Sequence, residues 1–489
     1  MVRQHFIFGI ENPDYTVINS NTRYNQVKGY GLEYGTFNDD IKSTSFRANV
    51  NAGEDYLICV KVNRNCTIEN PLFINDVEIS KEWLQEEDSS MISFRFAAIE
   101  SSLYFEIPLV FEDLCELSLS PIPKRTASKN PSIYLISDST VKTYGLDQSP
   151  MAGWGQVIHR FFNREIKVDN RAMGGRSTKL AYKEGRLNDL LVDIKPGDYM
   201  FIQFAHNDMA QGKPERYVTI EQYKDYLNNK YIKGALQRGG TPVCLTSMNR
   251  RTFDNETKTF VDSFPTYTQA MREVANENKL TLLDLNQRSL AFYNSLGLNN
   301  TDPLFMQLRP GEHSNYLDGL DDNTHFREAG AKQMARMVIE EINHKLPALS
   351  SYTLNPQSVL NEVFADTMNY WARDQVELMA RLGIMAEEPD GFFHPEADIT
   401  VGTFFKALGK ITDHPDLNSF KLTIDNFLDL HTASSVISQL GYADVSVQFL
   451  LRNSEEHDYR LTKGEVAAIL YKLYFHIKIK EHTLPLEGY

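Results

Sequence analysis

Residues 133–145 read IYLISDSTVKTYG, and this stretch decides how the chain around it is interpreted. Four apolar or aromatic residues predict a short buried strand, which ends at once on the polar sequence SDST. Strand-like and helical runs then alternate from about 131 to 347, and the strand-like runs read SIYLIS, IKVDN, DYMFIQFA, TPVCLTS and KLTLLDL. Because parallel strands need crossover connections, the alternation predicts a parallel sheet with helices on both faces. Ligands bind such sheets at the carboxyl ends of the strands, so the polar residues there are site candidates.

The composition limits the classes of protein to consider. The 489 residues exceed one ordinary domain, and 42% hydrophobic residues predict a globular, soluble chain. A formal net charge of −15 argues against nucleic acid or an anionic membrane as the main partner. The N-terminal apolar run is shorter than a signal peptide needs, and four cysteines without paired spacing predict no metal site. We therefore expect a cytoplasmic protein, or a secreted or cell-surface protein if a leader has been removed.

Two flanking segments have different patterns from the central one. Residues 1–122 carry short β-rich stretches between Asn, Asp and Gly clusters, which predicts an antiparallel β-sandwich. The sequence PIPKRTASKN that comes next, residues 121–130, is typical of a linker. Residues 352–489 contain amphipathic runs such as NYWARDQVELMARLGI and predict a mainly helical domain. The chain is thus predicted to hold three domains, at 1–122, 131–347 and 352–489.

Polar sequences follow the predicted strands of the central segment at four places, which read SDST, NRAMGGRST, FAHND and LDDNTHFREAG. A serine nucleophile needs an adjacent base, usually His, that a third group orients. His325 can be the base for Ser139, and Asp322 can accept a hydrogen bond from the other ring nitrogen. The tetrahedral intermediate of acyl transfer also needs donors for its oxyanion. The backbone N–H groups of Ser139 and Gly175 and the side-chain amide of Asn207 can supply them.

Each of these residues also has a purely structural explanation. A Ser after a strand is commonly a helix N-cap, and Asn207 and Gly175 are typical of turns. The pair Asp322 and His325 can cap the helix that follows it. All four features occur at predicted strand ends of one domain, and this conjunction favours a catalytic site.

The four sequences resemble the conserved blocks of the SGNH (GDSL-type) hydrolases, and within that family the rhamnogalacturonan acetylesterases. The matching sequences are SDSTV, NRAMGGRS, FAHND and DDNTHF, and AGWGQ and FMQLRPGEHSNYLDGLDDNTHF are also similar to the acetylesterase branch. The resemblance implies a three-layer α/β/α, flavodoxin-like fold without metal or cofactor. It also implies a double displacement in which Ser139 takes an acetyl group that water then removes. By the same resemblance Asp322 and His325 complete the triad, and Gly175 and Asn207 complete the oxyanion hole.

Two positions depart from the family pattern, because Ser137 and Ala205 stand where the family usually has glycine. Ser137 is therefore a rival candidate for the nucleophile. Three further residues are candidate substrate contacts. Arg176 can bind a uronate carboxylate or pair within its domain, and Trp154 can border the pocket or pack in the core. His206 is the third candidate, and it is treated as structural unless evidence shows a contact.

The flanking segments resemble known modules as well. The N-terminal segment is similar to the galactose-binding-type jelly roll that precedes some members of this esterase branch. The C-terminal segment resembles S-layer homology repeats, but after Ile399 and Thr400 it reads VGT instead of the expected Arg-Ala-Glu pattern. We therefore expect a degenerate module for packing or oligomer contacts rather than a cell-wall anchor.

The central resemblance implies an acetylesterase that acts on pectin-derived rhamnogalacturonan oligosaccharides. A first alternative is an acetylesterase of xylan or another acetylated glycan. A second is a non-catalytic carbohydrate- or wall-binding protein built on a decayed esterase. The expected partner is an acetylated oligo- or polysaccharide, with neither nucleic acid nor membrane, and the oligomeric state stays open.

Overall fold

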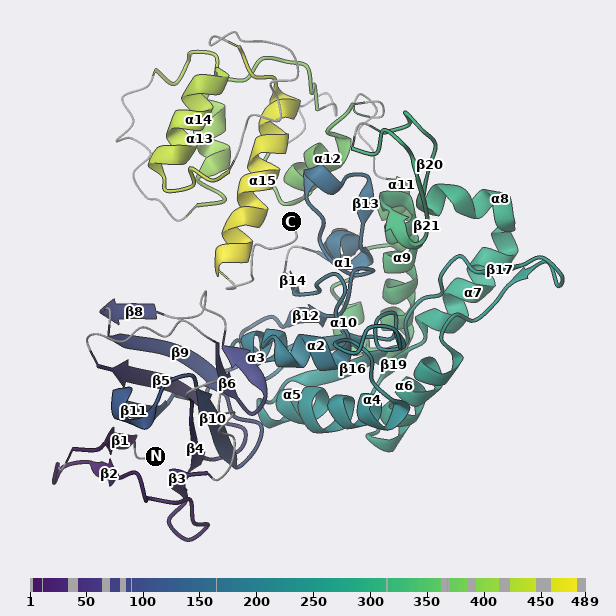
Figure 1. The fold of residues 1–489 in the computed structure, drawn as a ribbon. Coiled ribbons are helices and arrows are strands. Elements are labelled where there is room, and N and C mark those ends of the chain that lie inside the picture. The colour runs from purple at the N-terminus through teal and green to yellow at the C-terminus, as the bar shows by residue number, and fades with distance from the viewer. Residues whose placement is uncertain are drawn as a thin grey trace.

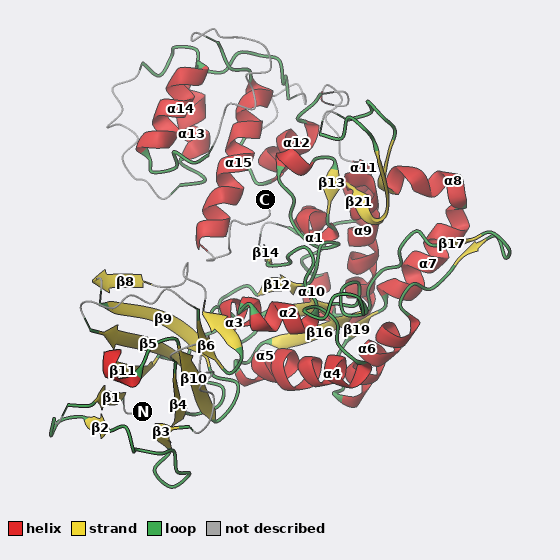
Figure 2. Cartoon of the chain, viewed as in Figure 1, coloured by secondary structure: helices red, strands yellow, loops and turns green. Residues whose placement is uncertain are grey.

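Figure 1 shows the computed structural model of the chain, coloured from the N-terminus to the C-terminus. The structure describes residues 3–10, 12–33, 43–63, 71–79, 85–88, 90–163, 165–313, 315–361, 367, 370–385, 393–412, 423–445 and 459–481. In Figure 2, strands gather in the N-terminal part, helices surround strands in the central part, and helices predominate in the C-terminal part. The chain therefore combines several sheets with layers of helices.

Two β-sheets form the N-terminal part. The first has the order β2-β1-β11-β5-β9-β8, with bounds β1 (Gln4–Phe8), β2 (Thr16–Ile18), β5 (Asp55–Val62), β8 (Gln85–Asp88), β9 (Met91–Ala97) and β11 (Leu114–Pro121). The second has the order β3-β4-β10-β6-β7, with bounds β3 (Tyr30–Leu32), β4 (Thr44–Asn49), β6 (Leu72–Ile74), β7 (Val77–Ile79) and β10 (Ser102–Ile107). Phe6 and Phe46 meet edge to face between the two sheets, with ring centroids 4.9 Å apart. The antiparallel prediction is wrong for one pair, because β1 and β2 are parallel.

A five-stranded parallel sheet lies at the centre of the chain. Its order is β14-β12-β15-β16-β19, with bounds β12 (Ser132–Ile136), β14 (Lys167–Asn170), β15 (Tyr199–Gln203), β16 (Thr241–Leu245) and β19 (Leu282–Leu283). These are the five strands that the sequence predicts. β14 follows β12 along the chain but lies on its outer side, so the strand order reverses next to β12, and sheets of this kind bind ligands at the carboxyl ends of the strands there.

Helices cover both faces of this sheet (Figure 1). Their bounds are α1 (Trp154–Val157), α2 (Thr178–Lys183), α3 (Arg186–Leu191), α4 (Ile220–Tyr226), α5 (Lys233–Gln237), α6 (Pro265–Glu277), α7 (Leu285–Leu296), α8 (Leu298–Thr301), α9 (Glu328–Lys345) and α10 (Pro347–Ser350). Successive residues of β12 point into different cores, because side chains alternate along a strand. Ile133 and Leu135 join the core of α1, α7 and α9, whereas Tyr134 and Ile136 join the core of α2 to α6. The central part is therefore a three-layer α/β/α unit.

A small antiparallel sheet that the sequence does not predict adds to this unit. Its order is β13-β21-β20, with bounds β13 (Met151–Ala152), β20 (Phe305–Leu308) and β21 (Leu320–Arg327). A two-stranded ribbon, β17 (Phe253–Asp254) and β18 (Thr259–Phe260), lies elsewhere in the same unit. The first of these sheets matters for the site, because β21 carries two of the predicted catalytic residues.

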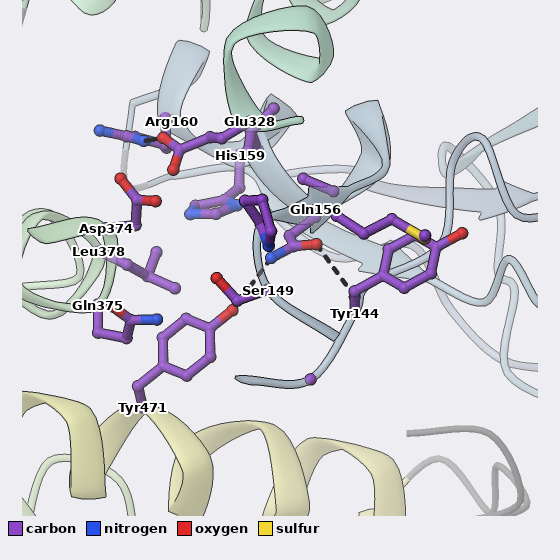
Figure 3. A pocket seen from close by; sticks show the side chains of 15 residues that line it. Tyr144, Ser149, Gln156, His159, Arg160, Glu328, Asp374, Gln375, Leu378 and Tyr471 are labelled. Carbon is purple, nitrogen blue, oxygen red and sulfur yellow. Dashed lines mark hydrogen bonds and ion pairs between the residues drawn. The ribbon is translucent and has the colours of Figure 1, made fainter. Parts of the chain in front are cut away.

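The C-terminal part has a hydrophobic core of its own. Its helices are α11 (Pro356–Asn361), α12 (Arg373–Arg381), α13 (Val401–Leu408), α14 (Leu430–Gln439) and α15 (Lys463–Glu481). A cavity of about 50 Å³ lies where α12 and α15 meet the central unit, and Figure 3 shows the side chains of Gln156, His159, Leu378 and Tyr471 around it. Across the described part of the chain, none of the helices combines the length and apolar character that a membrane-spanning segment requires.

Candidate active site

The turn after β12 leaves a single serine partly exposed. The Asp138 carboxylate accepts hydrogen bonds from the backbone N–H (2.9 Å) and hydroxyl (2.8 Å) of Thr140, which closes the turn tightly. Between positions 132 and 144, where every residue is described, Ser139 alone is not buried. Ser137 is 2% exposed, and its hydroxyl donates to the backbone carbonyl of Gln203 at 2.6 Å. The two serines therefore have different surroundings. Ser139 is partly exposed, whereas Ser137 is buried and hydrogen-bonded to β15.

Asp322 and His325 come from the irregular strand β21. Phe305 pairs with Phe326 and the next residue, Met306, pairs with Asp322, so residues 323–325 bulge out of the ladder. The Asp322 carboxylate accepts hydrogen bonds from the backbone N–H groups within this bulge, that of His325 at 3.0 Å among them. A regular strand would point positions i and i+3 to opposite faces, and the bulge brings both side chains to the same side.

The three side chains form one hydrogen-bonded chain. Ser139 Oγ lies 2.9 Å from His325 Nε2, and His325 Nδ1 lies 2.6 Å from Asp322 Oδ2. With the proton on Nδ1, the ring donates to Asp322 and its Nε2 accepts from the Ser139 hydroxyl. Burial alone would raise the pKa of the Asp322 carboxyl, but the hydrogen bond and charge of His325 hold it below its ordinary value. This geometry can remove a proton from Ser139 and hold it on the ring.

Donors for an oxyanion lie next to this chain. Gly175 has a φ of +78°, a left-handed conformation that glycine adopts without strain. A Cβ added at the preceding Gly174 would lie 3.7 Å from the Cβ of Ser139, so the glycine turn packs against the serine. The Asn207 amide nitrogen donates to the Arg176 carbonyl at 3.0 Å and has a second N–H to offer. These groups can stabilise negative charge on an oxygen beside Ser139.

Two of the three candidate substrate contacts form hydrogen bonds within the protein. The Trp154 ring is 1% exposed and donates to the Gln203 side chain at 3.2 Å, which favours the core-packing alternative. Arg176 donates to Glu184 at 2.7 Å and to the Gly174 carbonyl at 2.8 Å.

His206 is 5% exposed and packs against the ring of Phe264, with centroids 4.4 Å apart. Burial lowers the pKa of His206 well below its ordinary value, so the ring stays neutral. This position is consistent with the structural explanation.

Comparison with known proteins identifies the family. The family model described as GDSL-like Lipase/Acylhydrolase matches residues 133–338. The probable rhamnogalacturonan acetylesterase YesY of Bacillus subtilis is 41% identical over 211 residues, which are 43% of this chain and 91% of that protein. The chain belongs to the GDSL-like lipase/acylhydrolase family. It is a carboxylic ester hydrolase.

Two further relatives of the esterase are also proteins of Bacillus subtilis. The rhamnogalacturonan acetylesterase RhgT is 38% identical over 210 residues, which are 43% of this chain and 88% of that protein. The uncharacterised esterase YxiM is 25% identical over 359 residues, which are 69% of this chain and 89% of that protein. A solved structure of YxiM covers 70% of this chain and 98% of its own, at 23% identity and a TM-score of 0.39.

Several groups of the site escape sequence reasoning. The hydroxyl of Tyr144 donates to the Ser139 carbonyl at 2.8 Å. Arg216 donates to the Asn207 side-chain oxygen at 3.3 Å, and Arg250 donates to the His206 carbonyl at 3.1 Å. The sequence gives no spacing rule for these contacts, because all three residues lie in loops between regular elements.

Proposed function

We propose that this esterase removes acetyl groups from pectin-derived rhamnogalacturonan oligosaccharides, with Ser139, His325 and Asp322 as its catalytic triad. The observation that carries the proposal is the continuous chain from Ser139 Oγ to His325 Nε2 (2.9 Å) and from Nδ1 to Asp322 (2.6 Å). A serine with such a base is an activated nucleophile, and the third group holds the ring in the tautomer that the reaction needs.

The first displacement forms an acetyl-enzyme. Ser139 Oγ attacks the acetyl carbonyl carbon while its proton moves to His325 Nε2. The N–H groups of Ser139, Gly175 and the Asn207 amide stabilise the oxyanion of the intermediate. The bond from the carbonyl carbon to the sugar oxygen then breaks, and that oxygen takes the proton from His325.

The second displacement releases acetate. Water attacks the acetyl-enzyme while His325 Nε2 takes its proton, and the oxyanion forms again in the same place. The bond to Ser139 Oγ breaks and the hydroxyl recovers its proton from His325. Asp322, whose pKa lies below its ordinary range, stays ionised and stabilises the imidazolium in both steps.

The choice of substrate is supported by the names of two relatives. The chain is 41% identical to a probable rhamnogalacturonan acetylesterase and 38% identical to a second rhamnogalacturonan acetylesterase. An acetylated xylan remains the alternative substrate. The triad and the oxyanion donors act on the acyl group and do not determine which sugar carries it.

For the two flanking parts, we propose the jelly-roll and S-layer-homology-like modules that the sequence resembles, with roles in packing. Buried ion pairs support this role, since Arg238 of the central unit pairs with Asp55 of the sandwich at 2.8 Å. Arg160 likewise pairs with Glu377 of α12. A cytoplasmic location is part of the same proposal.

Acetate release tests the proposal. We expect the wild type to hydrolyse a small aryl acetate, and Ser139→Ala to lose activity by a factor of at least about 10³. Across acetylated fragments of pectin, xylan and mannan, the acetylated rhamnogalacturonan should be hydrolysed with the highest kcat/KM. An inactive wild type, or a Ser139→Ala variant of full activity, would refute the mechanism, and a preference for xylan would refute the substrate.

A further inference from the structure

Two arginines are anchored on consecutive residues at the carboxyl end of β15. Arg216 Nη1 donates to the side-chain oxygen of Asn207 at 3.3 Å. Arg250 Nη2 donates to the backbone carbonyl of His206 at 3.1 Å. The two residues come from different loops, one after β15 and the other after β16. One short segment just after β15 therefore holds two guanidinium groups, one through a side-chain oxygen and the other through a backbone carbonyl.

Arg216 lies directly over the oxyanion turn. A Cβ added at Gly175 would lie 3.3 Å from Arg216 Nη2, and one added at Gly174 would lie 3.7 Å from the Cβ of Ser139. Its hydrogen bond also fixes the orientation of the Asn207 amide. In a flipped amide, the NH2 group would face the N–H of Arg216, and the oxygen would face the carbonyl oxygen of Arg176. The rest of the guanidinium is turned toward the glycine turn.

Arg250 lies against the preceding residue of the same segment, through its hydrogen bond to the His206 carbonyl. The plane of Phe264 lies under its guanidinium, with 5.2 Å between Cζ and the ring centroid. Burial lowers the pKa of Arg250, while the negative charges of Asp138 and Asp322 act in the opposite direction. Arg250 therefore interacts electrostatically with Asp322 of the triad.

Both guanidinium groups lack the close carboxylate partner that Arg176 has. Arg176 Nε lies 2.7 Å from Glu184, whereas the ion pair of Arg216 is with the exposed Glu215 at 3.6 Å. Among the described residues, Arg250 forms no ion pair within 4.0 Å. A half-buried cation without a close counter-ion costs free energy, which a ligand carboxylate would offset.

We propose that Arg216 and Arg250 form an anionic subsite that binds a uronate carboxylate of the glycan beside the acetylated sugar. The inference rests on the proposed function and names the residues that select its substrate. A guanidinium presents paired N–H donors that match a carboxylate, and a neutral xylo-oligosaccharide has no group to fill this subsite. Positive charge at this subsite also offsets the repulsion of an acidic glycan by a chain of formal charge −15.

The test compares selectivity, because a ratio of two substrates cancels any effect on the shared chemistry. The kcat/KM values of Arg216→Gln and Arg250→Gln are measured on acetylated rhamnogalacturonan oligosaccharides and on neutral acetylated xylo-oligosaccharides. The acidic-to-neutral ratio is expected to fall by about tenfold in each variant, chiefly through KM, with part of it restored in Arg216→Lys. Added salt should lower the wild-type ratio more than that of the variants.

A matched control removes the same charge elsewhere. Arg336 on α9 pairs with Glu340 and packs over Phe292, so Arg336→Gln should keep the wild-type ratio. If the two subsite variants also keep it while the wild type prefers the acidic glycan, the inference is wrong and the proposed function stands. The inference is equally overturned if both substrates lose activity to the same extent, because Arg216 would then act only through Asn207. A wild type that cleaves the aryl acetate without preferring the acidic glycan would instead contradict the proposed substrate.

Discussion

At the scale of single residues, the two serines of the opening stretch differ in their surroundings. Ser137 and Ser139 are two positions apart on a strand that has just ended, and either hydroxyl suits a nucleophile by its chemistry. The structure buries Ser137 against the Gln203 carbonyl and sets Ser139 against His325. Ser137 thus stands at the position where the family usually has glycine. Its hydroxyl is hydrogen-bonded to the Gln203 carbonyl of β15.

Replacing Ser137 therefore tests a structural contact. We expect Ser137→Ala to lower the free energy of unfolding by about 1 kcal/mol, because one buried hydrogen bond is lost. Its kcat on an aryl acetate should stay within a few-fold of the wild-type value. Urea unfolding and initial rates check the two expectations. A complete loss of activity in a folded Ser137→Ala would contradict the purely structural role of this serine.

Local signals explain what the sequence could predict at this scale. The apolar runs of the central strands and the polar residues after them lie within a few positions of each other, so the five strands and the candidates Ser139, Asn207 and His325 could be located. The positions of Arg216 and Arg250 could not, since they depend on how two loops fold back onto the end of β15.

At the scale of secondary-structure elements, a buried carboxylate joins β15 to α2. The Asp208 carboxylate accepts hydrogen bonds from the backbone N–H (2.9 Å) and hydroxyl (2.7 Å) of Thr178, the first residue of α2. Burial raises the pKa of Asp208 to about 7, and the neighbouring Asp138 acts in the same direction. The connection that positions the glycine turn is therefore sensitive to pH.

The Asp208→Asn variant tests this sensitivity. In the unfolded chain the carboxyl loses its proton near its ordinary pKa of 3.8, while the folded protein keeps it until about 7. The folded state binds more protons in this window, so the contribution of Asp208 to stability is present below it and is lost as the pH rises through it. We expect the stability of the wild type relative to Asp208→Asn to fall between pH 4 and pH 8 by up to about 4 kcal/mol. Urea unfolding across this range measures it, and a constant difference would contradict the shift.

The bulge in β21 shows where sequence reasoning about elements ends. The sequence predicts Asp322 and His325 shortly before a helix, which α9 confirms, but it does not predict that both residues lie on the strand β21. The spacing of Asp322 and His325 pointed to the pair, but the strand was not predicted. β21 pairs with β20 and with β13, and β13 lies more than 150 positions away in the sequence.

At the scale of the whole molecule, the C-terminal helices contact the segments that carry the site. Figure 3 shows Arg160 beside Glu328, which opens α9 three residues after His325, and Arg160 also pairs with Glu377 of α12. Tyr471 of α15 accepts a hydrogen bond from Gln156 at 3.2 Å.

The other end of Gln156 leads to the nucleophile. Its side-chain oxygen accepts a hydrogen bond from the Tyr144 N–H at 3.0 Å, and the Tyr144 hydroxyl donates to the Ser139 carbonyl at 2.8 Å. The C-terminal helices are therefore connected both to the turn that carries Ser139 and to the start of α9, which follows His325. Contacts between residues 315 positions apart cannot be read from local patterns, which explains why this connection was not predicted.

Glu377→Ala tests whether this connection holds the molecule together. Glu377 is 5% exposed and pairs with Arg160 and Arg373, so its removal takes one of two carboxylates from the buried Arg160, which keeps Glu328. We expect a loss of about 1.5–3 kcal/mol in the free energy of unfolding, because a charge-assisted hydrogen bond is lost, and a kcat on an aryl acetate that falls more than KM changes. The matched control is Glu340→Ala on α9, because Glu340 also pairs with two arginines but is 28% exposed. Such a surface pair contributes about 0–1 kcal/mol, so equal losses in the two variants would show that the helical part is not bound through this ion pair.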